Sequence, residues 1–250
     1  MALQEELEKQ GVWLFKYRGT LPIIILLVGL AIYLHTALNP EIFLLKGTIY
    51  EDYFVYFCIF ISLIGQVVRA YTVGHTPKNT SGRNTGEQVA DTLNTSGIYS
   101  TVRHPLYVGN FLMWLGPALV TGNVWFVVAF CLFYWVYYER IMFAEEQFLR
   151  RKFKDTYTSW AERVPAFIPS FKNFEKPNIS FSWKKVLKKE KNGFAAIFII
   201  FALFDVLGQL VTGKNDYNYY LLGACAFSIV LYIILKILKK KSSVLHTEGR

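Results

Sequence analysis

Cysteine is scarce in this chain. Only three of the 250 residues are cysteines, and each of them lies inside an apolar run. Cys58, Cys131 and Cys225 form neither a Cys-x-x-Cys pair nor a set with metal-ligand spacing. We therefore expect no cysteine metal site and interpret all three side chains as apolar residues of the core or of the lipid-facing surface.

Several motifs of soluble enzymes are also missing. The sequence has no glycine-rich phosphate loop, no Gly-x-Gly-x-x-Gly pattern and no Ser/His/Asp arrangement. Its histidines and acidic residues show no metal-ligand spacing either. These absences argue against a soluble nucleotide-binding fold and against a metal site.

Long apolar blocks are what the sequence does contain. Hydrophobic residues make up 53% of the chain and aromatic residues 17%, in blocks rather than in alternation. A spanning helix needs roughly 18 to 20 residues, and four of the six apolar blocks reach that length. We expect one all-α, polytopic membrane domain over residues 1–250. The six blocks cover residues 21–38, 53–73, 106–120, 124–138, 194–212 and 217–238.

The third and fourth blocks are shorter than the others. Only residues 121–123 separate them, and such a short polar linker predicts a tight helical hairpin. The fourth helix can gain length by continuing beyond the membrane through residues 137–153, which are charged and aromatic.

Basic residues are distributed unevenly between the predicted loops. If both termini are cytoplasmic, 23 Lys and Arg fall on the cytoplasmic side, whereas only Lys46 and Lys214 fall outside. This asymmetry is typical of membrane proteins, whose cytoplasmic loops collect positive charge. The net charge of +9 is thereby explained without a nucleic-acid partner, and the basic segment 182–191 is expected at the membrane interface.

Polar residues cluster directly before the predicted hairpin, in residues 97–110. Arg103 and His104 precede Pro105, and proline suits the first turn of a helix because no backbone donor is needed there. Tyr99 and Tyr107 flank the two ionisable residues. We expect these side chains at a loop-to-helix junction beside the membrane.

Acidic residues return to the same membrane face in the stretch 137–153. Glu145 and Glu146 are adjacent in the sequence and Arg140 precedes them. The stretch admits a plain interpretation, a solvated helix end in which Glu146 pairs with Arg150 four residues later. It also admits a functional one, in which the two stretches are the halves of one site.

Asp205 and Gln209 lie one helical turn apart inside the fifth apolar block. Acidic groups within a membrane are costly and often functional. Gln209 can instead hydrogen-bond Asp205, and the pair then joins helices. The spacing leaves both interpretations open.

Two segments in this order, DTLNTSGIYSTVRHPLYVG and EEQFLRRKFKDTYTSWAERVPAFIP, resemble the isoprenylcysteine carboxyl methyltransferase and phospholipid methyltransferase superfamily of integral membrane enzymes. The shared pattern is Gly-x-Tyr, Arg-His-Pro-x-Tyr-x-Gly, a hydrophobic hairpin, a Glu-Glu pair and Val-Pro. The resemblance covers residues 84–170. The helix pair expected over residues 194–238 lies outside it.

The resemblance implies S-adenosylmethionine as methyl donor, bound on the cytoplasmic side between the loop and the fourth helix. Arg140 is one position out of register with the arginine that binds the acceptor in the carboxyl-methylating branch. By motif position, the donor-binding residues are Asp91, Thr92, Leu93, Asn94, Tyr99, His104, Pro105, Leu106, Tyr107 and Glu145. The residues assigned to the chemistry are Arg103, His104, Arg140 and Glu146.

The implied function is a membrane methyltransferase for a lipid or lipid-linked acceptor. A carboxylate or phosphate oxygen is favoured as acceptor atom, as in a prenylcysteine carboxyl group or a lipid A phosphate, because basic residues border the proposed site. Three alternatives remain open: a phospholipid amine N-methyltransferase, a sterol-reductase-like enzyme that uses a nicotinamide cofactor, and a non-catalytic membrane protein.

Overall fold

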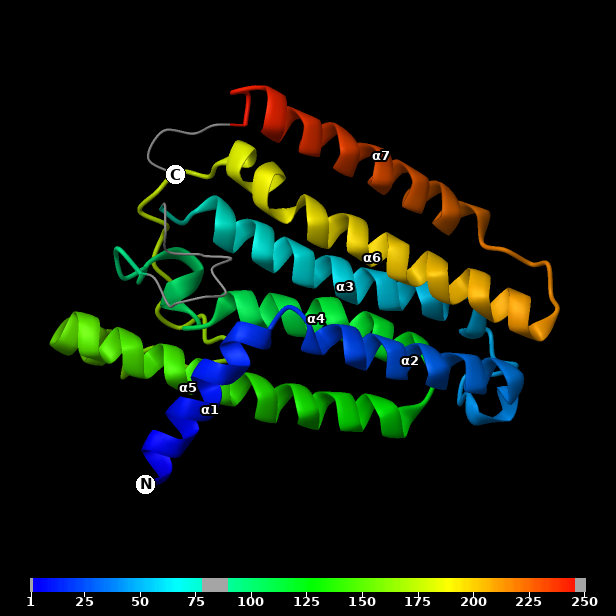
Figure 1. The fold of residues 1–250 in the computed structure, drawn as a ribbon, viewed down its shortest axis with the longest axis horizontal. Coiled ribbons are helices and arrows are strands. Elements are labelled where there is room, and N and C mark those ends of the chain that lie inside the picture. The colour runs from blue at the N-terminus through cyan, green and yellow to red at the C-terminus, as the bar shows by residue number, and fades with distance from the viewer. Residues whose placement is uncertain (1, 78–89, 246–250) are drawn as a thin grey trace.

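The chain folds into α-helices, and all but the tilted N-terminal helix run side by side along the long axis of the molecule (Figure 1). The computed structural model describes residues 2–77 and 90–245, and this part of the chain contains no β-strand, which confirms the expected fold class. Two 3₁₀ turns, Pro40–Ile42 and Gly97–Ser100, connect helices. The helices are α1 (Leu3–Tyr17), α2 (Leu21–Leu38), α3 (Glu51–Gly74), α4 (Pro105–Val120), α5 (Val124–Ala161), α6 (Trp183–Thr212) and α7 (Tyr219–Lys241).

Length and composition identify the membrane-crossing helices. Among the described residues four helices, α3, α5, α6 and α7, are long and apolar enough to cross a bilayer. The pair α1 and α2 meets the same criterion only when taken together across a 71° bend. Helix α4 is apolar but has 16 residues. The chain is therefore a polytopic membrane protein, and the expected number of six spans stays a prediction.

The predicted hairpin is present as α4 and α5. Helix α4 begins at Pro105, as the sequence indicates. Helix α5 begins after Asn123, whose side chain accepts a hydrogen bond from the backbone N–H of Phe126 at 2.9 Å. It then continues to a kink at Lys154 (φ 46°, ψ −125°), beyond which a further helical stretch reaches Ala161. The expected extension through residue 153 is confirmed, and the break at Lys154 directly follows it.

Helix α6 begins earlier than the apolar pattern indicates. Ser182 caps it by accepting a hydrogen bond from the backbone N–H of Lys185 at 3.3 Å, so the basic segment 182–191 forms its first turns. The expected start at residue 194 was wrong because hydropathy registers only the apolar part of a helix. Lysine and glutamate are good helix formers and extend it beyond the apolar stretch.

Helices α3 and α4 approach each other closely at two glycines. A Cβ atom on Gly65 would overlap the backbone oxygen of Gly109. Ser62, one turn before Gly65, donates a hydrogen bond to the backbone oxygen of Met113 at 3.0 Å. Small residues at a helix interface allow such close backbone contact in membranes, and the contact fixes the position of α4 against α3.

Asp205 supports the connection between α6 and α7. Its Oδ2 atom accepts a hydrogen bond from the backbone N–H of Asn218 at 3.1 Å. The Asn218 side chain donates to the hydroxyl of Tyr56 on α3 at 3.0 Å. This acid therefore holds a loop in place, which favours the structural interpretation of Asp205.

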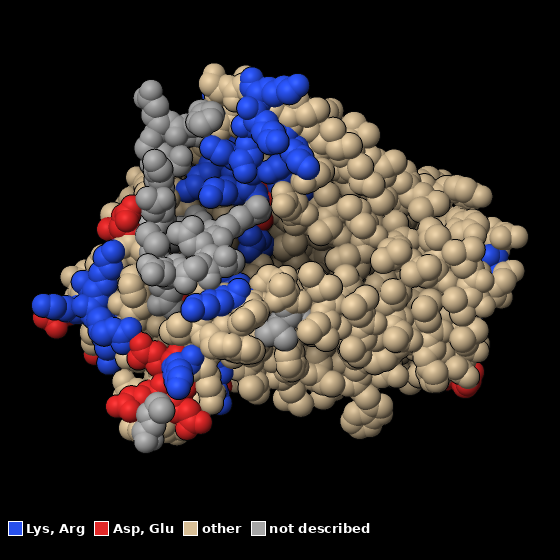
Figure 2. All heavy atoms as spheres, in the orientation of Figure 1, with Lys and Arg blue, Asp and Glu red and all other residues tan. Residues whose placement is uncertain are grey.

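Charged side chains gather at one end of the molecule, and the remainder of the face in Figure 2 is largely uncharged. The charged end contains the beginning of α6 and the end of α7, together with the residues before α4 (Figure 1). The loops and extensions that the sequence analysis assigns to one membrane face thus lie at one end of the fold.

Candidate active site

The loop before α4 is held by backbone hydrogen bonds to a distant segment. Arg103 and His104 donate their backbone N–H groups to the carbonyl oxygens of Pro165 and Ala166, at 2.9 and 3.2 Å. This pairing explains why Arg-His-Pro and Val-Pro occur together in one sequence pattern. It fixes the directions in which the Arg103 and His104 side chains leave the loop.

A backbone turn and a further hydrogen bond position this loop. Gly97 has a φ of 63°, in the left-handed region that favours glycine. The indole N–H of Trp160, near the end of α5, donates to the backbone oxygen of Tyr99 at 3.1 Å. The loop is therefore anchored to the later part of the second sequence segment, at Trp160 and at residues 165–166.

The side chains of the two stretches meet in a cluster of charged and polar groups. His104 Nε2 lies 2.9 Å from Glu146 Oε1, and His104 Nδ1 lies 3.6 Å from Glu145 Oε2. Tyr107 donates its hydroxyl to Glu145 Oε1 at 2.8 Å. Arg103 Nε lies 3.3 Å from Glu146 Oε1. The two adjacent glutamates of α5 are thus held by three residues from the start of α4.

The environment of His104 favours its charged form. The ring is almost completely buried, and burial alone lowers the pKa of a histidine. Contacts with Glu145 and Glu146 outweigh this effect, so that the pKa of His104 is raised above its ordinary value. The imidazolium form can donate to both carboxylates at once.

This raised pKa predicts how stability depends on pH. The folded state holds the His104 proton more tightly than the unfolded state does, so the stabilisation is complete below about pH 6.5 and is lost as the pH rises through the raised pKa. The stability lost with rising pH is at most about 1.4 kcal/mol per pH unit, the value for one proton. Thermal unfolding of detergent-solubilised protein should show wild type and His104→Gln converging as the pH rises. A constant difference from pH 6 to pH 10 would contradict the prediction.

Helix α1 adds a residue that the sequence analysis did not identify. Arg18, just after this helix, lies 3.7 Å from Glu145 Oε1, and its guanidinium stacks over Phe15 with 3.8 Å between Cζ and the ring centroid. The buried Phe15 and the bond from the Tyr137 hydroxyl to the Leu14 backbone oxygen (3.2 Å) dock α1 on α5. The spacing of Leu7, Leu14 and Phe15 was the available signal for a helix here.

The structure does not bring every predicted residue to the cluster. Arg140 forms an ion pair with Glu139 at 2.9 Å, so the expectation that it acts beside Glu146 has no support in the geometry. Its position on α5 points it away from the face that carries Glu146. Arg103 occupies that place instead.

The remaining predicted donor-binding residues lie around the same loop. Asp91 and Thr92 are exposed, and Asn94 is half-buried. Leu93 and Tyr99 pack against the buried cluster near the end of α5 that includes Trp160. Pro105 and Leu106 form the first turn of α4. Residues 78–89 lie outside the described residues.

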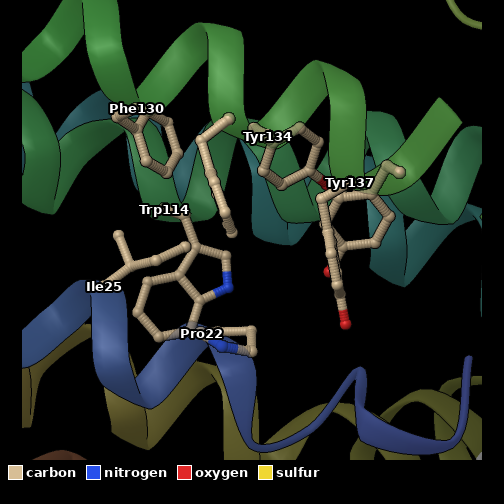
Figure 3. Close-up of a pocket in the computed structure, with 8 residues that line it drawn as sticks. Pro22, Ile25, Trp114, Phe130, Tyr134 and Tyr137 are labelled. Carbon is tan, nitrogen blue, oxygen red and sulfur yellow. The ribbon is translucent and has the colours of Figure 1, made fainter. Parts of the chain in front are cut away.

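An apolar pocket lies between α2, α4 and α5 and adjoins the cluster. Figure 3 shows Trp114, Phe130 and Tyr134 facing Pro22 and Ile25 across it. The Tyr134 hydroxyl donates to the backbone oxygen of Tyr107 at 2.7 Å, so the pocket wall touches the residue that holds Glu145. The lining residues are Pro22, Ile25, Trp114, Phe130, Phe133, Tyr134, Tyr137 and Tyr138.

Fold and site together define an all-α membrane protein with a glutamate pair at the end of a helical hairpin. Residues 56–156 match the family model described as phospholipid methyltransferase. This match includes α4 and the glutamates of the cluster. Over those residues the chain is similar to the phospholipid methyltransferase family, as the motif resemblance predicted.

Several curated proteins are similar over parts of the chain. A protein-S-isoprenylcysteine O-methyltransferase of Schizosaccharomyces pombe is 39% identical over 75 residues, which are 30% of this chain and 32% of that protein. The cobalt-zinc-cadmium resistance protein CzcN of Cupriavidus metallidurans is 38% identical over 79 residues, 32% and 36% of the two chains. A probable protein-S-isoprenylcysteine O-methyltransferase of Oryza sativa subsp. indica is 32% identical over 127 residues, 48% and 63%.

These similarities cover limited parts of the proteins. The chain spans about a third of the length of the first two relatives. No solved structure is significantly similar to it. The site geometry therefore has to carry the functional argument.

Proposed function

We propose that this chain is an S-adenosylmethionine-dependent membrane methyltransferase that acts on an anionic oxygen of a lipid or lipid-linked acceptor. The observation that carries the proposal is the glutamate pair. Glu145 and Glu146 are held side by side by His104 and Tyr107, at a loop-to-helix junction that adjoins an apolar pocket. The family of residues 56–156 supports the same class of reaction.

The chemistry of the cluster fits a cationic donor. Carboxylates and aromatic faces attract a sulfonium group, and both types of group occur here. When bound, S-adenosylmethionine supplies an electrophilic methyl group on a cationic sulfur, which becomes a neutral thioether as the new oxygen–methyl bond forms. Glu145, Tyr107 and Tyr99 would hold this donor. Hydrogen bonds from Tyr107 and the histidine keep the carboxylates oriented before it binds.

The chemical class of the acceptor is inferred from the groups of the site that are not assigned to the donor. Arg103 is the cation beside Glu146, and a guanidinium holds a carboxylate or phosphate oxygen well. The apolar chain of the acceptor would lie along the aromatic surface that α2, α4 and α5 form beside the site. An oxyanion is nucleophilic at neutral pH, whereas a protonated amine must first lose a proton. These features favour O-methylation over N-methylation.

Product chemistry tests this proposal. Membranes that contain the protein are incubated with methyl-labelled S-adenosylmethionine and lipid extract, and the labelled product is treated with mild base. Carboxyl methyl esters release volatile methanol readily, phosphate methyl esters resist more, and methylated amines release none. Label that stays on the nitrogen of an amine headgroup would contradict the proposed acceptor. Absence of transfer, together with binding of a reduced nicotinamide cofactor, would favour a reductase.

We further propose that both termini and the site face the cytoplasm, because 23 Lys and Arg lie on that side of the predicted topology and two on the other. Reporter fusions after Lys46 and Lys214 should report an outside location. A fusion after Asn173 should report a cytoplasmic one. A cytoplasmic signal after Lys46 would overturn the proposed orientation.

A further inference from the structure

A second buried charge pair joins α6 to α3 and α4. Arg69 on α3 donates from Nε to Glu190 Oε2 and from Nη2 to Glu190 Oε1, both at 2.8 Å. Its Nη1 atom donates to Asn110 Oδ1 on α4 at 2.7 Å. Gln66 Nε2 donates to Glu190 Oε2 at 3.2 Å. The side chains of Arg69 and Glu190 are 17% and 5% exposed. A buried, bidentate ion pair of this kind fixes the relative orientation of the two side chains.

The two charges come from different parts of the chain. Arg69 and Asn110 lie within residues 56–156, which match the phospholipid methyltransferase model. Glu190 lies outside that match, in the first turns of α6. Glu190, on the helix pair α6 and α7, thus neutralises the charge of Arg69, which lies in the part that matches the family model. The sequence alone assigned no function to this helix pair.

Arg69 is close enough to the proposed donor site for its charge to matter there. Burial raises the pKa of the Tyr99 phenol, the charge of Glu145 raises it further, and the charge of Arg69 partly lowers it. Asn110, which contacts Arg69, is on α4 one turn beyond Tyr107, whose hydroxyl holds Glu145. Both charges therefore act on the same region.

The charge balance of the cluster makes this proximity important. Two carboxylates, Glu145 and Glu146, face the cationic groups of Arg18, Arg103 and His104. The site has no surplus of negative charge. A further uncompensated cation in the low-dielectric interior would repel a positively charged donor.

We propose that Glu190 is a positioning residue that neutralises Arg69 and thereby keeps the site able to bind a cationic donor. The proposal rests on the proposed function, because it concerns the donor assigned there. It gives the additional helix pair a role in the reaction. It also predicts that the two partners of one ion pair affect donor binding in opposite directions.

The test uses the full-length protein with three variants: Glu190→Gln, Arg69→Gln and the double variant. S-adenosylmethionine binding is measured by calorimetry, and thermal unfolding of each protein is followed without donor. Glu190→Gln leaves a buried, uncompensated guanidinium and should weaken donor binding roughly three- to ten-fold. Arg69→Gln and the double variant should bind at least as tightly as wild type. Asp205→Asn, which removes a charge at the other end of α6, is the control and should leave donor affinity unchanged.

The outcomes separate charge from scaffolding. Equal losses of donor affinity in both single variants would overturn the proposal. An ion pair that only holds the helices together would be broken equally by removal of either partner. Unchanged affinity in Glu190→Gln would overturn it too. If Glu190→Gln does not fold, weaker binding by Arg69→Gln is sufficient to overturn it. Wild type that binds no donor would overturn the proposed function and this inference together.

Discussion

Glu145→Gln is expected to weaken S-adenosylmethionine binding about ten- to hundred-fold, since a charge-assisted contact contributes roughly 1.5–3 kcal/mol. Glutamine keeps the shape of Glu145 and can still accept the hydrogen bond from Tyr107. It removes the negative charge that complements the sulfonium. Calorimetry on the purified protein in detergent measures the effect directly.

The matched control for this variant is Glu139→Gln, on the same helix. Glu139 is 46% exposed and pairs with Arg140 outside the cluster, so its neutralisation should leave donor affinity unchanged. Thermal unfolding should show that both variants are folded. Wild-type affinity in well-folded Glu145→Gln would remove this residue from the donor site.

Arg103→Gln should reduce turnover about ten- to hundred-fold, the range for loss of one charge-assisted contact with the acceptor oxygen. Donor affinity should fall little, because the substitution removes a cation from the region where the cationic donor binds. Arg103 Nε is buried and, among the described residues, makes no hydrogen bond despite its 3.3 Å ion-pair distance to Glu146. The guanidinium thus retains capacity to bind an anionic oxygen.

Arg140→Gln is the matched control for the acceptor prediction. Its guanidinium contacts Glu139 rather than Glu146, so turnover should stay near that of wild type. The measurement is the rate of methyl transfer at saturating donor, with acceptor varied to separate kcat from KM. A larger loss of turnover in Arg140→Gln than in Arg103→Gln would assign acceptor binding to Arg140 instead of Arg103.

The sequence by itself determined the class of the protein and most of its helices. Apolar blocks of spanning length must be helical in a membrane, because backbone groups find no water there. Pro105 marked the start of α4, and residues 121–123 marked the turn of the hairpin. The motif pattern also indicated the family whose model residues 56–156 match. The roles assigned to the site residues stay predictions.

Helix boundaries outside the apolar blocks were harder to predict. Helix α1 and the first turns of α6 are mostly polar, so neither forms one of the long apolar blocks. Their helical structure is stabilised partly by packing on neighbouring helices, as by Phe15 in the core. Such packing depends on partners that are distant in the sequence.

Only the tertiary structure decided which charges meet. Helical periodicity states which residues share a face of one helix, but it carries no information on the helix that faces them. Arg103 rather than Arg140 contacts Glu146, Arg18 reaches Glu145, and Glu190 neutralises Arg69. An ion pair acts strongly only over a few ångströms. Its partners are therefore fixed by how the helices pack, which no single segment of this sequence specifies.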